Sequence, residues 1–180
     1  MSEGEDNGRS PALTRRGALG GIAATTLVAP QALARNKEKK MAFETPKCEF
    51  AFELYAACDP PMPMGDTPAG KAALIPITGG HFEGPGIKGT VLPGGADWPV
   101  TRPDSVNFVE ARYPIKTDDG VIIQIYNRGP MVPGTKGRTM TSFSAPAGKY
   151  DWLNKSVFVG TLEVPPGPFK GVTVRFFKVT

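Results

Sequence analysis

The chain has 180 residues, of which 40% are hydrophobic, and its formal net charge is +4. This length gives room for one ordinary domain, and the hydrophobic content is enough to build a single core. Lysine and arginine are scattered among acidic residues without the basic and aromatic stripe of a nucleic-acid surface, so we expect no nucleic-acid partner. The 22 glycines and 19 prolines punctuate apolar runs, which is typical of an all-β chain with many turns.

The N-terminal residues resemble an export signal. Arg15 and Arg16 precede an uncharged stretch from Gly17 to Ala34 that ends in an A-x-A cleavage pattern. The pattern predicts a cleaved twin-arginine signal over residues 1–34 and a linker over 35–47, and hence a periplasmic or secreted protein. The alternative is a transmembrane anchor, but the stretch is weakly apolar and barely long enough to span a bilayer, so we expect no stable membrane span after cleavage.

Cysteine and histidine are rare in this sequence. Cys48 and Cys58 would lie about 33 Å apart on one extended strand, far beyond disulfide reach. His81 is the only histidine, and no metal-ligand spacing or phosphate-binding glycine motif occurs. We therefore expect neither a metal site nor a cofactor.

Strand patterns follow one another from residue 48 to residue 180. Phe50, Phe52 and Leu54 alternate with polar or small residues, the period of a half-buried strand. Residues 59–67 contain three prolines and are expected to form a loop. Further strands are predicted over 72–78, 86–92, 106–116, 121–128, 138–145, 156–163 and 172–179. About eight to ten short antiparallel strands indicate a sandwich or a barrel, and we prefer one closed β-barrel domain over 48–180, because closure removes long edge strands.

The TDDG sequence at residues 117–120 is a compact turn that would close a hairpin. Pairing Lys116 with Val121 places Tyr113 and Tyr126 on the same face of the hairpin, and a slip of one residue would exchange the faces.

Residues 77–98 contain seven glycines. Glycine at this density indicates positive φ angles or close approach of neighbouring strands. We interpret these glycines as corners that let the chain bend from strand to strand of the barrel.

Three motifs resemble a known bacterial and fungal family. The runs IPITGGHFEGPGIKGTVLPGGADW, ARYPIKTDDGVIIQIYNRG and YDWLNKSVFVG are similar to the family called domain of unknown function 3237, or UPF 0311, over residues 48–180. The resemblance implies a single lipocalin-like (calycin-type) β-barrel, a possible homodimer, and no agreed biochemical activity. Members usually have tyrosine where this chain has Gln124 and a longer insert where it has residues 130–149.

Candidate functional residues are carboxylates, arginines and aromatic side chains near predicted strand ends. Asp97 follows two glycines, where a tight turn could present it at a barrel mouth or could simply use it as a cap. Arg112 lies among apolar residues, so it either pairs with a glutamate such as Glu110 or contacts a ligand. The candidate catalytic residues are Asp97, Arg112 and Tyr126. The candidate ligand-binding residues are Trp98, Tyr113, Gln124, Asn127, Arg128, Trp152, His81 and Glu53.

Two hypotheses of different classes fit these residues. One is a barrel that binds a small aromatic, carbonyl or carboxylate molecule, with aromatic side chains lining the cavity and an arginine orienting the ligand. The other is a cofactor-independent isomerase, cyclase or lyase, in which Asp97 or Glu53 moves a proton while Arg112 and Tyr126 stabilise an oxyanion. A structural dimer without a ligand is a third possibility.

Overall fold

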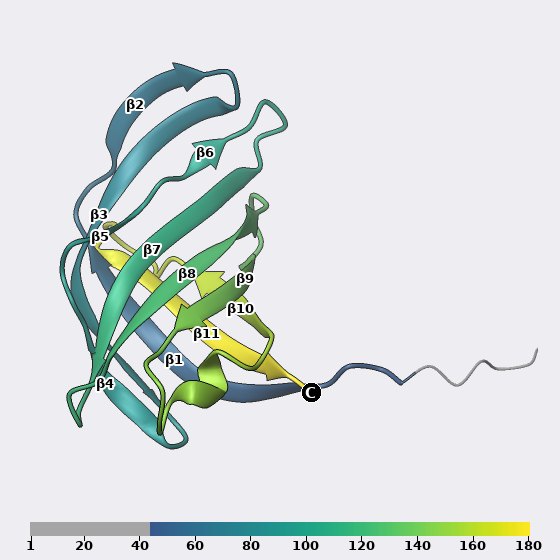
Figure 1. Ribbon diagram of the computed structural model, residues 1–180. Coiled ribbons are helices and arrows are strands. Elements are labelled where there is room, and N and C mark those ends of the chain that lie inside the picture. Colours follow the sequence, from purple (N-terminus) through teal and green to yellow (C-terminus); the bar gives the residue numbers. More distant parts are fainter. Residues whose placement is uncertain (1–43) are drawn as a thin grey trace, which may run out of the picture. The chain divides into compact units, whose positions relative to one another are not determined.

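The structure is a computed structural model, and it describes residues 44–180. The predicted signal and most of the predicted linker lie outside these residues. The described part is almost entirely β-strand, which confirms the predicted all-β class (Figure 1). Its strands are β1 (Cys48–Cys58), β2 (Met62–Thr67), β3 (Gly70–Gly84), β4 (Ile87–Val91), β5 (Gly95–Asp97), β6 (Val100–Thr101), β7 (Asn107–Thr117), β8 (Ile122–Met131), β9 (Gly137–Ser144), β10 (Phe158–Glu163) and β11 (Gly171–Val179), and the 3₁₀ helix η1 is Asp151–Leu153.

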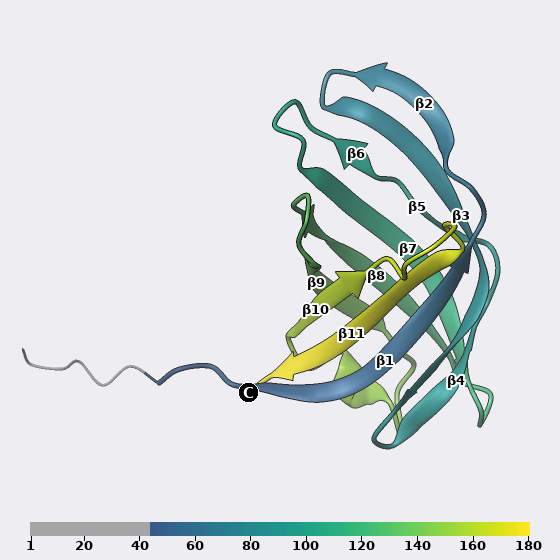
Figure 2. The same ribbon diagram turned by 180° about the vertical axis from the view of Figure 1, so that it is seen from behind.

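Eight of the strands form a closed antiparallel barrel. Their order is β1, β11, β10, β9, β8, β7, β4 and β3, and β1 also pairs with β3. Figure 2 shows β1 beside β11 from the opposite side. Because the first strand bonds to partners on both sides, this ring has no open edge, and the expected barrel is confirmed.

The remaining strands extend one end of the barrel. β5 and β6 each pair with both β3 and β7, and β2 pairs with β3 alone. The expectation of a loop over residues 59–67 is therefore wrong from Met62 onward. Proline is tolerated here because β2 is an edge strand, and its register shifts between Pro63 and Gly65.

The β7–β8 hairpin differs by one residue from the predicted register. Lys116 lies opposite Ile122, not Val121, so Tyr113 lies opposite Ile125. The Thr117 hydroxyl accepts a hydrogen bond from the Val121 amide at 2.9 Å, which draws Val121 into the turn. The slip exchanges the faces of β8: Ile123, Ile125 and Asn127 are buried, while Gln124 and Arg128 are exposed.

A β-bulge changes the first predicted strand in a similar way. The register of β1 against β11 shifts between Phe50 and Phe52. Phe50 is consequently 46% exposed, while Ala51 and Phe52 are both buried. The strict alternation predicted for this strand holds only after the bulge.

One glycine shows how the barrel closes between β1 and β3. Gly80 has φ +135°, and a Cβ atom there would lie 1.9 Å from the Tyr55 carbonyl oxygen. Only glycine lets β3 approach β1 this closely in this conformation. Gly94, by contrast, has φ +99°, and a Cβ atom there would meet no other atom within 4 Å, so this glycine serves a turn.

The barrel interior is solid at the η1 end. Phe52 packs on Phe176 with ring centroids 4.7 Å apart, and Phe143 packs on Phe158 at 4.9 Å. Trp152 of η1 lies against Phe158 at 5.8 Å. Burial of these rings supplies much of the hydrophobic stabilisation of the fold.

Asp119 fastens the chain at this end of the barrel. It accepts hydrogen bonds from the Thr117 hydroxyl at 2.5 Å and the Tyr150 hydroxyl at 2.9 Å, and it pairs with Lys149 at 2.9 Å. These three donors, led by Thr117, hold the pKa of the Asp119 carboxyl well below its usual range.

Within residues 44–180, no helix is long and apolar enough to cross a membrane.

Candidate functional site: a cavity at the open end of the barrel

The barrel is hollow at the end opposite η1. A cavity of about 120 Å³ lies between the end of β1, the start of β7, the end of β8 and the start of β11. Most of its lining is aliphatic, because the inward positions of these strands carry small or branched residues such as Ala56, Val109 and Val174. An eight-stranded barrel leaves room for one small ligand where large side chains do not fill it.

Asp97 brings a carboxyl group into this apolar cavity. It closes β5 opposite Ala111 of β7, and its Oδ1 accepts a hydrogen bond from the Glu110 amide at 2.8 Å. Burial raises the pKa of the Asp97 carboxyl to about 6, although the Glu110 amide acts in the opposite direction. The carboxyl can therefore gain or lose a proton near neutral pH.

Two buried polar atoms of the cavity lining lack a hydrogen-bond partner within the described residues. They are the Tyr113 hydroxyl and Asn107 Oδ1, both on β7 and both from residues that line the cavity. Burial, and then the nearby charge of Asp97, raises the pKa of Tyr113 far above its usual range, so the phenol stays protonated. An unpaired buried polar group costs about 1 to 3 kcal/mol, so a ligand that pairs with these atoms would recover that cost.

Asn127 and Cys58 complete the polar part of the lining. Asn127 is buried, and its Oδ1 accepts a hydrogen bond from the Thr141 hydroxyl at 2.6 Å. Burial, with a smaller contribution from Asp97, raises the pKa of the Cys58 thiol to about 11. Cys58 and Cys48, at the two ends of β1, are both free thiols.

Several predicted site residues lie on the outer surface of the barrel instead. The Arg112 and Arg128 guanidinium carbons lie 5.1 and 5.7 Å from the centroid of the Tyr126 ring, and the Tyr126 hydroxyl donates to Glu110 Oε1 at 2.8 Å. Trp98, which is 45% exposed, joins them in a shallow groove. These side chains are separated from the cavity by the β7–β8 sheet. Arg112 is stabilised by Tyr126 and not by the expected glutamate pair.

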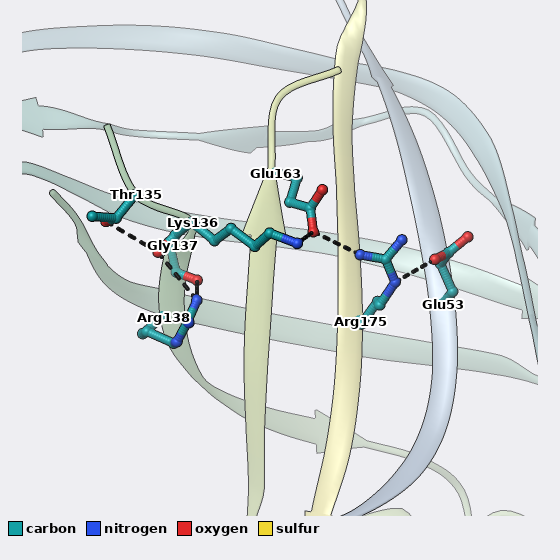
Figure 3. A network of polar contacts seen from close by, with 7 residues as sticks. All are labelled: Glu53, Thr135, Lys136, Gly137, Arg138, Glu163 and Arg175. Carbon is teal, nitrogen blue, oxygen red and sulfur yellow. Dashed lines mark hydrogen bonds and ion pairs between the residues drawn. The ribbon is translucent and has the colours of Figure 1, made fainter. Parts of the chain in front are cut away.

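Glu53 also faces outward, in a row of charges across β1, β11 and β10. Figure 3 shows Arg175 between two glutamates, with Nε 2.6 Å from Glu53 and Nη1 2.7 Å from Glu163. Lys136 also contacts Glu163, at 2.5 Å. The row ties three neighbouring strands together, and it places Glu53 outside the cavity.

The other three predicted ligand-binding residues lie elsewhere. His81 is exposed on β3 and packs against Tyr55 on the outer face, with ring centroids 5.8 Å apart. Gln124 is exposed on β8, and Trp152 covers the solid end of the barrel. The structure thus brings together Asp97, Tyr113 and Asn127 and leaves the rest of the predicted set outside the cavity. Within residues 44–180, no three His, Cys, Asp or Glu side chains gather closely enough to hold a metal ion.

The family follows from the match of this chain to known proteins. Residues 46–137 match the model of a family described as Protein of unknown function (DUF3237). A UPF0311 protein of Clostridium acetobutylicum is 31% identical over 150 residues, covering 73% of this chain and 93% of the relative. The chain belongs to the DUF3237 family.

Relatives of the DUF3237 family extend the comparison to a solved structure and to a named enzyme. The crystal structure of a conserved protein of unknown function from Rhodopseudomonas palustris superposes with a TM-score of 0.70 at 28% identity, covering 77% of this chain and all of that one. A Penicillium herquei protein named as a hydroalkoxylation enzyme is 30% identical over 116 residues, covering 64% of this chain and 74% of its own.

Two polar cavity residues of this DUF3237 protein, Asn107 and Cys58, were absent from the predicted site. Both could have been found by continuing an alternation already visible in the sequence. Cys58 shares the inward face of β1 with Leu54 and Ala56, and Asn107 shares that of β7 with Val109.

Proposed function

We propose that this protein binds a small, largely apolar molecule in the barrel cavity. The observation that carries the proposal is the pair of unpaired polar atoms, on Tyr113 and Asn107, in a cavity whose lining is mostly aliphatic. Binding sites for small molecules commonly combine apolar walls with a few convergent polar groups. A ligand would bury its apolar surface and pair with at least one of these polar atoms, so the two contributions to affinity act together.

Native mass spectrometry of the protein purified from its own cells tests this proposal. We expect a retained small molecule on the wild-type chain and none on Ala111→Leu, because Ala111 lines the cavity and extra methylene groups would fill it. Met140→Leu is the matched control, since Met140 is 58% exposed and is not part of the cavity lining. Ligand binding in this cavity would be contradicted by a wild-type chain that retains no small molecule. It would also be contradicted if both variants retained the molecule to the same extent.

A second candidate function is proton-transfer catalysis on the bound molecule. Asp97 favours it, because a carboxyl with a pKa of about 6 is suited to act as both acid and base near neutral pH. The named hydroalkoxylation enzyme of Penicillium herquei provides support from a relative. Adding a hydroxyl group across a C=C bond breaks the O–H bond and the π bond and forms a C–O and a C–H bond.

A single carboxyl group can carry out both proton transfers of such an addition. Asp97 as carboxylate would accept the hydroxyl proton, and Asp97 as acid would deliver a proton to carbon. Tyr113 would donate a hydrogen bond to the oxygen on which negative charge develops. The same roles serve an isomerase, cyclase or lyase that needs no redox step.

The rate of conversion of the retained molecule distinguishes catalysis from binding alone. We expect Asp97→Asn to lower kcat by about 10²- to 10⁴-fold, and wild-type kcat to fall as the pH drops below about 6 if the carboxylate form starts the reaction. Tyr126→Phe removes a hydroxyl on the outer surface and should leave kcat unchanged. Equal kcat values for the wild type and Asp97→Asn would exclude Asp97 as the acid–base group.

A further inference from the structure

A row of apolar side chains crosses the outer face of four neighbouring strands, β1, β11, β10 and β9, which Figure 2 shows side by side. Phe50 of β1 lies opposite Phe177 of β11. Val159 of β10 lies between Phe177 and Met140 of β9. Phe50 and Met140 are 46% and 58% exposed, and the two residues between them are partly buried. Single exposed apolar residues are common, but a continuous row of them marks an interaction surface.

Two further residues widen this row into a patch. Val157, directly before β10, is 68% exposed, and its carbonyl oxygen accepts a hydrogen bond from the Val179 amide at 2.9 Å. The rings of Phe50 and Phe177 contact each other with their centroids 5.9 Å apart, so they form one continuous apolar surface. The outer apolar patch consists of Phe50, Met140, Val157, Val159, Phe177 and Val179. Phenylalanine and methionine are enriched at the centres of protein interfaces.

A charged row runs beside the apolar row across the same four strands. Glu53 of β1 lies opposite Arg175 of β11, and Thr161 of β10 lies between Arg175 and Arg138 of β9. The β1 end of this row is therefore acidic and the β9 end is basic. Arg138 is exposed, and its guanidinium donates to two nearby backbone carbonyls (Figure 3), so among residues 44–180 it has no acidic partner.

The order of residues makes both rows complementary to themselves. Suppose that two copies pack face to face about a twofold axis that runs parallel to the strands, between β10 and β11. Each outer strand then meets the opposite outer strand of the second copy. Phe50 faces Met140 of the second copy, and Glu53 faces its Arg138. A twofold axis across the strands would instead bring the two acidic ends together.

We propose that this protein forms a twofold-symmetric homodimer through the outer apolar patch. The outer faces of β1, β11, β10 and β9 from the two copies pack against each other through their side chains, as two sheets do in a β-sandwich. The apolar rows fill the centre of the interface, and the charged rows form oppositely charged pairs beside them. All of these residues lie on the outside of the barrel, so the dimer and the proposed ligand binding can be tested separately.

Sedimentation equilibrium of the full chain measures this association. We expect a dimer for the wild type and a dissociation constant at least about a hundredfold higher for Met140→Lys, because symmetry buries the new charge at the interface twice. Ile122→Lys is the matched control, since Ile122 is 57% exposed but lies on β8 outside the patch, and it should associate like the wild type. A monomeric wild type overturns the proposed dimer and assigns the patch to another partner. Equal weakening by both lysine variants also overturns it.

A mixture of two charge-reversed chains tests the twofold arrangement. In Glu53→Lys and in Arg138→Glu, like charges meet twice across the axis. We expect each variant alone to dimerise about three- to tenfold more weakly than the wild type at low ionic strength. An equimolar mixture should regain the wild-type association, because opposite charges meet at both places in the heterodimer. A loss that persists in the mixture comes from within each chain and contradicts the pairing of Glu53 with Arg138 of the second copy.

Discussion

Asp97→Asn raises the free energy of unfolding by about 2 to 3 kcal/mol at neutral pH, since the wild type carries a desolvated carboxylate there. Its pKa is about 6 in the native chain against an ordinary value of 3.8. The stability contributed by the protonated form is complete below about pH 4 and is lost as the pH rises through 6. An amide is neutral at every pH, and its oxygen can still accept the hydrogen bond from the Glu110 amide.

Urea unfolding at about pH 4 and about pH 8 measures this effect. The difference in unfolding free energy between variant and wild type should be small at about pH 4. It should reach about 2 to 3 kcal/mol at about pH 8. The other titratable groups near Asp97 are Glu110, Tyr113 and Cys58. Asp66→Asn changes an exposed aspartate and should stay within about 0.5 kcal/mol of the wild type. A destabilised Asp97→Asn at pH 8 would show that the carboxylate is favourably solvated in the native chain.

Gly80→Ala destabilises the protein by at least about 3 kcal/mol or prevents folding. The new methyl group would lie 1.9 Å from the Tyr55 carbonyl oxygen, and φ is +135° at this residue. Relief of the clash requires β3 to move away from β1, which opens the pairing that closes the barrel. Thermal unfolding and the yield of soluble protein report the loss.

Gly94→Ala separates the clash from the strain of a positive φ angle. Gly94 has φ +99° with open space around it, so alanine there should cost only about 1 to 2 kcal/mol. If the two alanine variants are equally stable, the close contact between β3 and β1 does not constrain the barrel. If only Gly80→Ala fails to fold, the contact is required for closure.

The fold was predictable because its strands carry a period of two and its turns carry glycine, proline and aspartate. Two local features made the predicted inward and outward faces of the strands wrong. The Thr117 side chain takes part in the β7–β8 turn, which shifts the register by one residue, and the bulge after Phe50 turns that ring outward. Neither a side chain inside a turn nor a bulge changes the alternation of apolar and polar residues in the sequence, so neither could be predicted from it.

The cavity was only partly predictable for the same reason. A register error of one residue moves a whole strand from one side of the sheet to the other. It made Tyr126 and Arg128 appear to share a face with Tyr113, whereas Asn127 shares it. Asp97 was expected at a barrel mouth from its position after two glycines. Its proximity to Tyr113 depends on the pairing of β5 with β7, which connects residues that no local pattern relates.

The division of the barrel into a solid end and a hollow end has a consequence for how such proteins change. Phe52, Phe143, Phe158 and Phe176 hold the strands together at one end, and Asp119 fastens the turn there. Side chains at the hollow end contribute less to the stability of the fold. Substitutions in the cavity wall therefore change which ligand fits without unfolding the barrel. New ligand preferences can therefore arise from a few substitutions around Asp97, because the aromatic core at the other end keeps the barrel folded when they occur.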